Sequence, residues 1–430
     1  MKKVGRLGLA GALLVALMAC TGHGVVQAGV QDGGPPPEQA AGSYRVLAPI
    51  ESGNLLLFPV VRAGGKSLGA TPFLTLDEGI KSGEVEVTEA GRVQGLVRPR
   101  GPIGGPPYGQ DPMRGDPPPD QNRYRGDQVN TLVLANHSGK PLLLLAGEIV
   151  TGGKQDRVIA KDRIVPAEGD PIDLGVFCIE PGRWTASSTT FGAAAKAPAH
   201  SFMVQPTVRE RAMVAKDQQQ VWDSVHGSIA QLEIAAAPAA STPMNGGAGT
   251  AHNGSINTTS YAKAMQDSQV SAKVDEAAAP VAKSRDQVLA QLRDQHAIGV
   301  VVAVRGQIVW ADLLASTDLL SRYWTKLVRS YAAESLTEGD TRAAPTVADA
   351  EHFLDAPTGG TETSEGDVGV YRYRELRAGV TETFVLESLL PGAGYDVHIS
   401  KMRLRAAEHR MKPPQFGPPA PFYPQPQIYR

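Results

Sequence analysis

The sequence carries almost no net charge. Its 430 residues include 42 Lys and Arg against 44 Asp and Glu, so no strong positive field gathers nucleic acid to its surface. After the first 20 residues, no apolar run is long enough to span a membrane. We therefore expect no nucleic-acid partner, and the N-terminus is the only expected membrane attachment.

The motifs of common enzyme classes are also missing. Nine histidines are present, but they form no His-Glu-x-x-His pattern and no close His/Asp pair, so no metal site is expected. The sequence has no Gly-x-Ser-x-Gly elbow, Walker loop or dinucleotide fingerprint. The usual hydrolase, nucleotide-binding and Rossmann functions are not indicated, and no cofactor is expected.

The first 20 residues are typical of a bacterial secretion signal. Basic residues precede an apolar run from Leu7 to Met18, which is shorter than a usual membrane span. Leu17-Met18-Ala19-Cys20 resembles a lipobox, in which Cys20 becomes the lipid-modified N-terminus. Val26-Gln27-Ala28 offers an alternative cleavage site that gives an untethered periplasmic protein. Both alternatives predict a cell-envelope protein.

Cysteine is scarce, since Cys20 and Cys178 are the only two. Cleavage or lipid attachment removes Cys20 from pairing, so no intramolecular disulfide is expected, although an exported protein can form one. Cys178 lies in an apolar run, where a small buried thiol is the usual interpretation. A nucleophilic thiol needs an activating neighbour, and the sequence shows none.

Three stretches have the composition of loosely ordered chain. Residues 98–126 are dense in Gly and Pro, and residues 235–283 contain almost no large apolar side chain to offset their ordering entropy. The tail over 405–430 is rich in Pro. We interpret the first two as insertions and residues 21–43 as a flexible linker. Replacing residues 240–279 by a short Gly/Ser linker is therefore expected to change stability by no more than about 1 kcal/mol.

Between these stretches, apolar residues recur with strand spacing. Short turns separate expected strands over residues 55–61, 84–88, 129–135, 142–145, 157–165 and 172–179. A short helix over 75–81, ended by Gly83, lies among them. This succession is typical of an antiparallel sheet or sandwich.

Longer helices are expected in the second half. Apolar residues close to helical spacing predict helices over 207–232 and from Thr317 or Asp318 to Leu336, and Ser284 is expected to cap a helix over 285–295. A hairpin around Gly306 and strands over 368–376, 380–389 and 396–402 complete the pattern. The sequence thus predicts an α+β fold dominated by antiparallel sheet, with a few packed amphipathic helices.

The most distinctive run extends from Leu142 to Arg157. An apolar strand ends there on Gly147 and Glu148, and a Gly152-Gly153 turn then leads into Lys154-Gln155-Asp156-Arg157. Glycine lets the backbone approach other groups closely at such a turn. A second run, Cys178-Ile179-Glu180-Pro181-Gly182-Arg183-Trp184, adds more long polar side chains.

With these two runs, the chain resembles the bacterial ARPP domain family, named for its genomic association with ADP-ribosylglycohydrolases and rhodanese-phosphatases. The resemblance continues through the hairpin at Gly306 into the helix with Trp324 and Tyr331, and extends from about Tyr44 to Leu404. Where the family tends to have two acidic residues after the glycine, this chain has Glu148 and Ile149. That difference argues against a mechanism that needs paired carboxylates there.

The family's polar positions can be interpreted in two ways. The residues at these positions are Glu148, Lys154, Gln155, Arg157, Glu180, Arg183 and Trp184. In a ligand pocket, the arginines would bind carboxylate or phosphate, Glu148 would accept from hydroxyls, and Trp184 would stack on a ring. In a buried polar network that joins two sheets, Glu148 would be paired to an arginine.

The resemblance implies no particular reaction, because the family has none established. We expect a non-catalytic module that binds a small molecule or a protein partner. The alternative is an enzyme acting on a sugar or ADP-ribose-like substrate, which only the family's genomic neighbours suggest. An enzyme needs a concave pocket in which Glu148 approaches a second acid, whereas a Glu148 sealed beneath the sheet favours the binding or structural interpretation.

Overall fold

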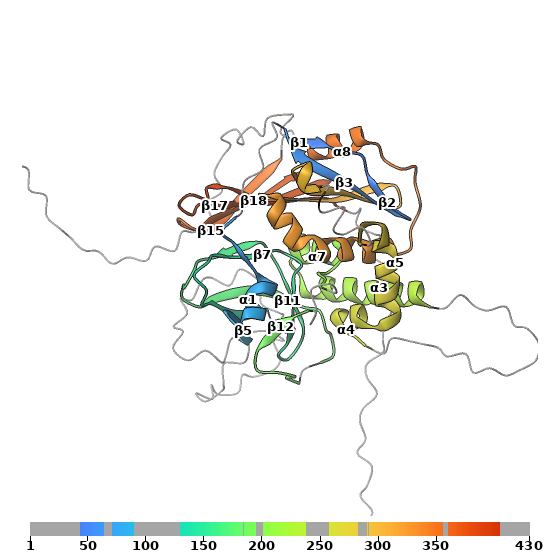
Figure 1. Cartoon of the computed structure of the whole chain (residues 1–430). Helices are drawn as coiled ribbons and strands as arrows, with labels where there is room; N and C mark the ends of the chain where they lie inside the picture. The colour runs from blue at the N-terminus through green and yellow to red at the C-terminus, as the bar shows by residue number, and fades with distance from the viewer. Residues whose placement is uncertain are drawn as a thin grey trace, which may run out of the picture.

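Two β layers form the body of the protein, with helices between and beside them (Figure 1). The computed structural model describes residues 44–63, 71–89, 130–183, 185–194, 201–237, 258–282, 290, 292–355 and 360–404. Among these residues, no helix is both long and apolar enough to cross a membrane. The expected α+β fold dominated by antiparallel sheet is confirmed.

The larger layer is a nine-stranded sheet in which every neighbouring pair is antiparallel. Its strand order is β1-β3-β13-β14-β18-β17-β16-β15, with β2 also paired to β3. The strands are β1 (Tyr44–Val46), β2 (Ile50–Ser52), β3 (Leu55–Arg62), β13 (Ala297–Val304), β14 (Gln307–Leu314), β15 (Thr361–Asp367), β16 (Tyr371–Ala378), β17 (Thr381–Ser388) and β18 (Tyr395–Arg403).

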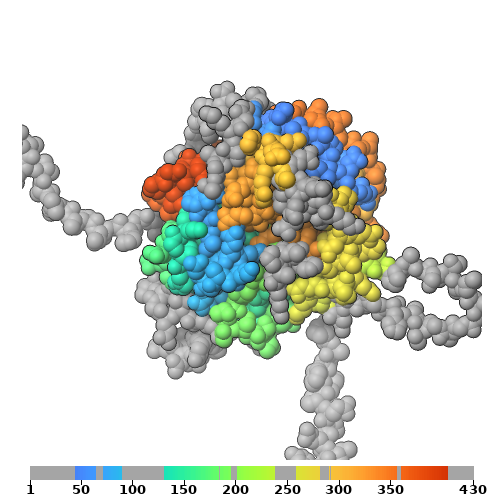
Figure 2. Space-filling view, in the orientation of Figure 1, coloured from blue at the N-terminus to red at the C-terminus, as the bar shows by residue number. Residues whose placement is uncertain are grey.

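Strand β3 is buried on both faces of this sheet, which explains its unbroken apolar sequence. Leu57 faces the core between the two layers, whereas Phe58 packs on the outer face beneath helix α8 (Val347–Leu354). Pro59 falls between the three residues paired with β2 and the three paired with β1, so its missing N–H interrupts neither ladder. In Figure 2, the blue N-terminal segment that holds β1, β2 and β3 lies beside orange segments from the second half of the chain.

The smaller layer combines a six-stranded and a three-stranded sheet. Their orders are β12-β8-β9-β11-β6-β5 and β10-β7-β4, and only β4 and β7 pair in parallel. The strands are β4 (Leu74–Thr75), β5 (Val85–Glu89), β6 (Thr131–Asn136), β7 (Leu142–Leu144), β8 (Ile149–Gly152), β9 (Arg157–Ile159), β10 (Arg163–Val165), β11 (Ile172–Cys178) and β12 (Phe191–Ala193).

Helix α7 (Thr317–Ser335) lies between the layers and is buried on nearly every side. Ser316 caps its N-terminus by accepting from the backbone N–H of Leu319. The other helices are α1 (Leu76–Ser82), α2 (Pro206–Glu210), the π-helical turn η2 (Arg211–Ala215), α3 (Gln218–Ala236), α4 (Tyr261–Gln266) and α5 (Ser268–Ala282). The short helix expected over 75–81 and ended by Gly83 is confirmed as α1, which Thr75 caps and which Gly83 ends in the left-handed conformation.

Two predicted elements are divided in the structure. The strand expected over 157–165 is two strands of different sheets, β9 and β10, separated by a turn that contains Asp162. The helix expected over 207–232 is interrupted at Lys216, whose φ of 51° is left-handed, and α3 begins after Asp217. The first break places the polar side chain of Asp162 in the interior, and α2, ahead of the second break, buries Arg209.

The expected insertion over 235–283 is wrong for its second part, and so is the expectation that residues 240–279 can be replaced without loss of stability. Residues 258–282 form α4 and α5, which bury Tyr261, Met265, Val270 and Val274 in the main core. The buried positions of α5 are small and four residues apart, so its Ala-rich composition suggested a linker while its spacing fits one face of a helix. The segments expected over 1–43, 98–126 and 405–430 lie outside the described residues.

Candidate functional site

Four charged side chains form a central charge network between the two layers. Asp312 on β14 accepts hydrogen bonds from both terminal nitrogens of Arg209, at 2.8 and 3.1 Å. His398 on β18 lies between two carboxylates, with Nδ1 2.6 Å from Asp162 and Nε2 3.1 Å from Asp312. All four residues are 0% exposed, so the network has no contact with solvent.

Neutral groups satisfy the remaining oxygens of this network. Ser400 donates to Asp312 at 2.7 Å, and the hydroxyl of Tyr331 also donates to it. The backbone N–H of Ala146 donates to Asp162 at 2.7 Å. Because Asp162 belongs to the smaller layer and Asp312 to the larger one, His398 joins the two layers electrostatically.

The charged groups of the network stabilise one another's ionised forms. Burial opposes ionisation of Asp312, but Arg209 and His398 hold the pKa of its carboxyl well below its usual range. Burial likewise opposes protonation of His398, but Asp162 and Asp312 raise its pKa to about 9. At neutral pH His398 is therefore protonated and Asp312 is ionised.

Raising the pH is expected to remove the contribution of His398 to stability. Its pKa of about 9 in the folded chain lies above the ordinary value of 6.5, so the stabilisation is complete below pH 6.5 and is lost as the pH rises through 9. The difference in unfolding free energy between wild type and His398→Gln should fall by up to about 3 kcal/mol over this range. Urea melts at several pH values measure it, and a difference that stays constant or grows would contradict the assignment.

Glu148 belongs to a second buried ion pair. It follows the turn at Gly147, is 0% exposed, and lies 2.5 Å from Nζ of Lys326 on α7. Its other oxygen accepts from the backbone N–H of Leu145 at 2.8 Å. Lys326 also lies 2.8 Å from Asp77, and these two carboxylates raise its pKa against the effect of burial. Glu148 is thus sealed in the interior, paired to a lysine and not to the arginine expected for a buried network.

Two other predicted residues, Glu180 and Arg183, meet Asp156, Ser260 and Lys263, and we call these five residues the glycine-turn cluster. Arg183 lies 2.5 Å from Glu180 and 3.4 Å from Asp156, and it also donates to the carbonyls of the Gly152-Gly153 turn. Ser260 donates to Asp156 at 2.7 Å, and Lys263 lies 2.9 Å from Glu180. Burial opposes ionisation of Glu180, but Arg183 and Lys263 lower the pKa of its carboxyl.

Beside this cluster, three buried side chains leave polar atoms without a partner among the described residues. Gln155 is 0% exposed, and neither its Oε1 nor its Nε2 has a hydrogen bond. The same holds for Nε of Arg157 and for Oε2 of Glu89, two side chains whose ends lie 3.9 Å apart. Arg157 also donates to the backbone carbonyl of Gln155 at 2.6 Å. Buried polar groups are nearly always hydrogen-bonded, so this concentration requires an explanation.

The structure therefore brings Gln155, Arg157, Glu180 and Arg183 to one place, together with the backbone N–H of Lys154, which donates to Glu89. Glu148 lies apart from them, with Lys326. Trp184 and Cys20 fall outside the described residues. Cys178 is 0% exposed, and burial raises the pKa of its thiol to about 11, which fits the expected inert buried thiol.

Sequence reasoning missed the central charge network and the lysine partner of Glu148. Asp312 lies in an apolar strand at a position that alternates with Trp310 toward the interior, and His398 has the same orientation on β18. A charged residue at an inward position of a strand is the signal that would have identified both.

The comparisons with known proteins identify one family. The model of the ARG and Rhodanese-Phosphatase-superfamily-associated Protein domain, ARPP-1, matches residues 43–402. No curated protein and no solved structure shows a significant match to the chain. The match includes both β layers, the central charge network and the glycine-turn cluster. The chain therefore belongs to the ARPP-1 domain family.

Proposed function

We propose that this chain is a non-catalytic binding module of the cell envelope, and that it binds a small hydroxyl-bearing molecule beside the Gly152-Gly153 turn. The unpartnered atoms of Glu89, Gln155 and Arg157 carry the proposal. Its envelope location, through a lipid on Cys20 or as a periplasmic protein, is supported by the signal-like first 20 residues.

The state of the carboxylates favours binding over catalysis. A general acid or base must reach the substrate and exchange a proton with it. Glu148 is instead held in an ion pair by Lys326, which also pairs with Asp77. Glu180 is held by Arg183 and Lys263. These ion pairs support a structural use of the acids and argue against the sugar or ADP-ribose enzyme.

The unpartnered atoms specify the ligand chemistry. Gln155 Nε2 and Arg157 Nε are donors, whereas Gln155 Oε1 and Glu89 Oε2 are acceptors. A hydroxyl group both donates and accepts, so neighbouring hydroxyls of a polyol or sugar complement such a mixed set. An anion would satisfy only the donors, and it would lie close to the carboxylate of Glu89.

Thermal-shift measurements on the full chain test this proposal with a panel of monosaccharides, disaccharides and polyols. A binding compound should raise the melting temperature, since at 100 times its Kd it adds about 2.7 kcal/mol to stability. Gln155→Leu is expected to lose the shift but to keep or increase stability without ligand, because it removes two unsatisfied buried atoms.

Gln219→Leu is the matched control, because that glutamine is exposed and its amide already donates to Asp223. This variant should keep the full shift. The proposal fails if no compound of the panel shifts the wild type, or if Gln155→Leu unfolds at a clearly lower temperature. The second result would mean that the Gln155 amide stabilises the fold itself.

A further inference from the structure

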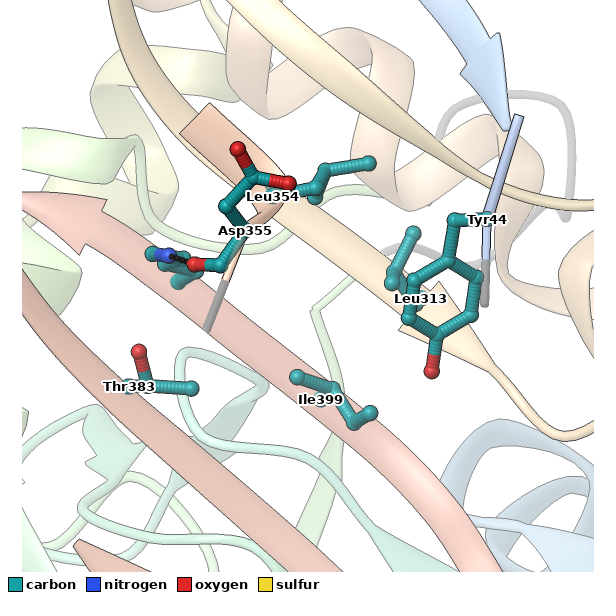
Figure 3. Close-up of a pocket in the computed structure, with 8 residues that line it drawn as sticks. Tyr44, Leu313, Leu354, Asp355, Thr383 and Ile399 are labelled. Carbon is teal, nitrogen blue, oxygen red and sulfur yellow. Dashed lines mark hydrogen bonds between the residues drawn. The ribbon is translucent and has the colours of Figure 1, made fainter. Parts of the chain in front are cut away.

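A small cavity lies on the outer face of the nine-stranded sheet, away from the glycine-turn cluster. Its volume is about 20 Å³, and it lies where β14, β17 and β18 meet the end of α8 and the start of β1 (Figure 3). Its lining is mainly apolar and consists of Tyr44, Ala311, Leu313, Leu354, Asp355, Thr383, Ile399 and Lys401.

Lys401 is the only amine in this lining, and it is 6% exposed. Its Nζ donates to the backbone carbonyl of Asp355 at 2.6 Å and lies 5.5 Å from the ring centre of Phe353. No carboxylate among the described residues forms an ion pair with it. The carboxylate of Asp355 instead lies 3.3 Å from His352.

A buried lysine without an ionic partner is costly to a fold, because its charged form loses water without gaining a counter-ion. Burial lowers the pKa of Lys401 to about 8, and the Asp355 carboxylate only partly opposes this effect. Tyr44, the remaining titratable group of the lining, stays a neutral phenol because burial raises its pKa. A methionine would fill the same space without this cost, so packing alone does not explain why the residue at this position carries an amine.

We propose that Lys401 is a covalent binding site for short aldehydes, which it holds as an imine in this cavity. The nitrogen lone pair attacks the carbonyl carbon, and the carbonyl π electrons move to oxygen, giving a carbinolamine. That intermediate loses its oxygen as water together with the two protons of the amine, and a C=N bond replaces the C=O bond. Desolvated lysines in apolar surroundings are suited to this chemistry because more of the amine is neutral.

The size of the cavity limits the aldehyde. A cavity of roughly 10–15 Å³ holds one water molecule. The cavity beside Lys401, with its volume of about 20 Å³, therefore admits one or two small groups. Leu313, Leu354 and Ile399 surround the space with hydrocarbon, which suits a two-carbon chain better than a ring or a charged group (Figure 3).

Reductive trapping on the full chain tests the proposal. The protein is incubated at pH 7 with acetaldehyde and cyanoborohydride, and each lysine peptide is followed by mass spectrometry. An ordinary lysine with a pKa of about 10.4 is neutral about 200 times less often at pH 7 than one with a pKa near 8. Even with restricted access, Lys401 is expected to be ethylated at least about tenfold faster than the exposed Lys140.

Two comparisons make the outcome decisive without depending on a variant. The proposal is overturned if, in the wild type, Lys401 is modified no faster than Lys140. It is also overturned if benzaldehyde, which the cavity excludes, modifies Lys401 as fast as acetaldehyde does. Lys401→Met should abolish the fast modification and melt at no lower temperature than the wild type, whereas Lys140→Met should leave the fast modification unchanged.

Discussion

A chain in which residues 258–282 are replaced by a Gly/Ser linker of equal length is expected to lose its cooperative unfolding transition. Helices α4 and α5 bury Tyr261, Met265, Val270 and Val274 in the main core. At about 1.5–3 kcal/mol for each large apolar side chain, their loss approaches the 5–15 kcal/mol that holds an average domain together.

Polar contacts add to this loss. Ser260 donates to the buried Asp156, and the hydroxyl of Tyr261 donates to the side chain of Gln205. Asp275 on α5 pairs with Arg329 on α7. Removing α4 and α5 therefore leaves Asp156 and Arg329 without partners that they have in the native fold.

Urea denaturation followed by circular dichroism measures this effect through the midpoint and the slope m. The matched control replaces residues 241–257 instead, for which the expected change stays within about 1 kcal/mol. A variant lacking 258–282 that kept the wild-type midpoint and slope would show that α4 and α5 contribute nothing to the folded core.

The sequence predicted the elements whose local signals agree with their burial. Residues 84–88 alternate as a half-buried strand does and form β5. The hairpin at Gly306 has left-handed residues at Arg305 and Gly306, as a tight turn between two strands requires. Helix α7 has a capping serine and an apolar stripe. In each case the local preference and the tertiary environment favour the same structure.

Helix α5 was missed because its packing uses small side chains. Val270, Val274 and Ala278 recur every fourth residue and are buried, but composition alone counts the surrounding Ala and Ser as linker. Alanine is the strongest helix former and lets another helix approach closely, so a low content of large apolar residues does not by itself exclude a core helix. The spacing of the buried residues therefore indicates helix α5 better than the composition of the segment does.

The candidate site was predicted in part. Gly152, Gly153, Glu180 and Arg183 come together because strands β8, β9 and β11 are neighbours, and both runs were recognised as polar clusters. The partner of Glu148 was not predictable in the same way. Lys326 lies 178 residues further along the chain on a helix, and only the packing of α7 between the layers brings it within 2.5 Å.

Arg209→Met is expected to cost about 3–5 kcal/mol of unfolding free energy, because it leaves a buried negative charge uncompensated. In the wild type, Arg209 and His398 balance Asp162 and Asp312, and every member of the network is 0% exposed. Methionine occupies the space of the side-chain stem, so packing loss contributes less than it would for alanine.

The double variant Arg209→Met with Asp312→Leu separates the ion pair from the rest of the network. It removes one cation and one anion and leaves His398 paired with Asp162 at 2.6 Å. The two changes should therefore couple, with a combined loss smaller than the sum of the single losses by at least about 1 kcal/mol.

Arg372→Met is the control from the same sheet. Its half-exposed pair with Glu387 should be worth no more than about 1 kcal/mol. Equal losses for Arg209→Met and Arg372→Met, with additive effects in the double variant, would mean that the central charge network does not hold the two layers together.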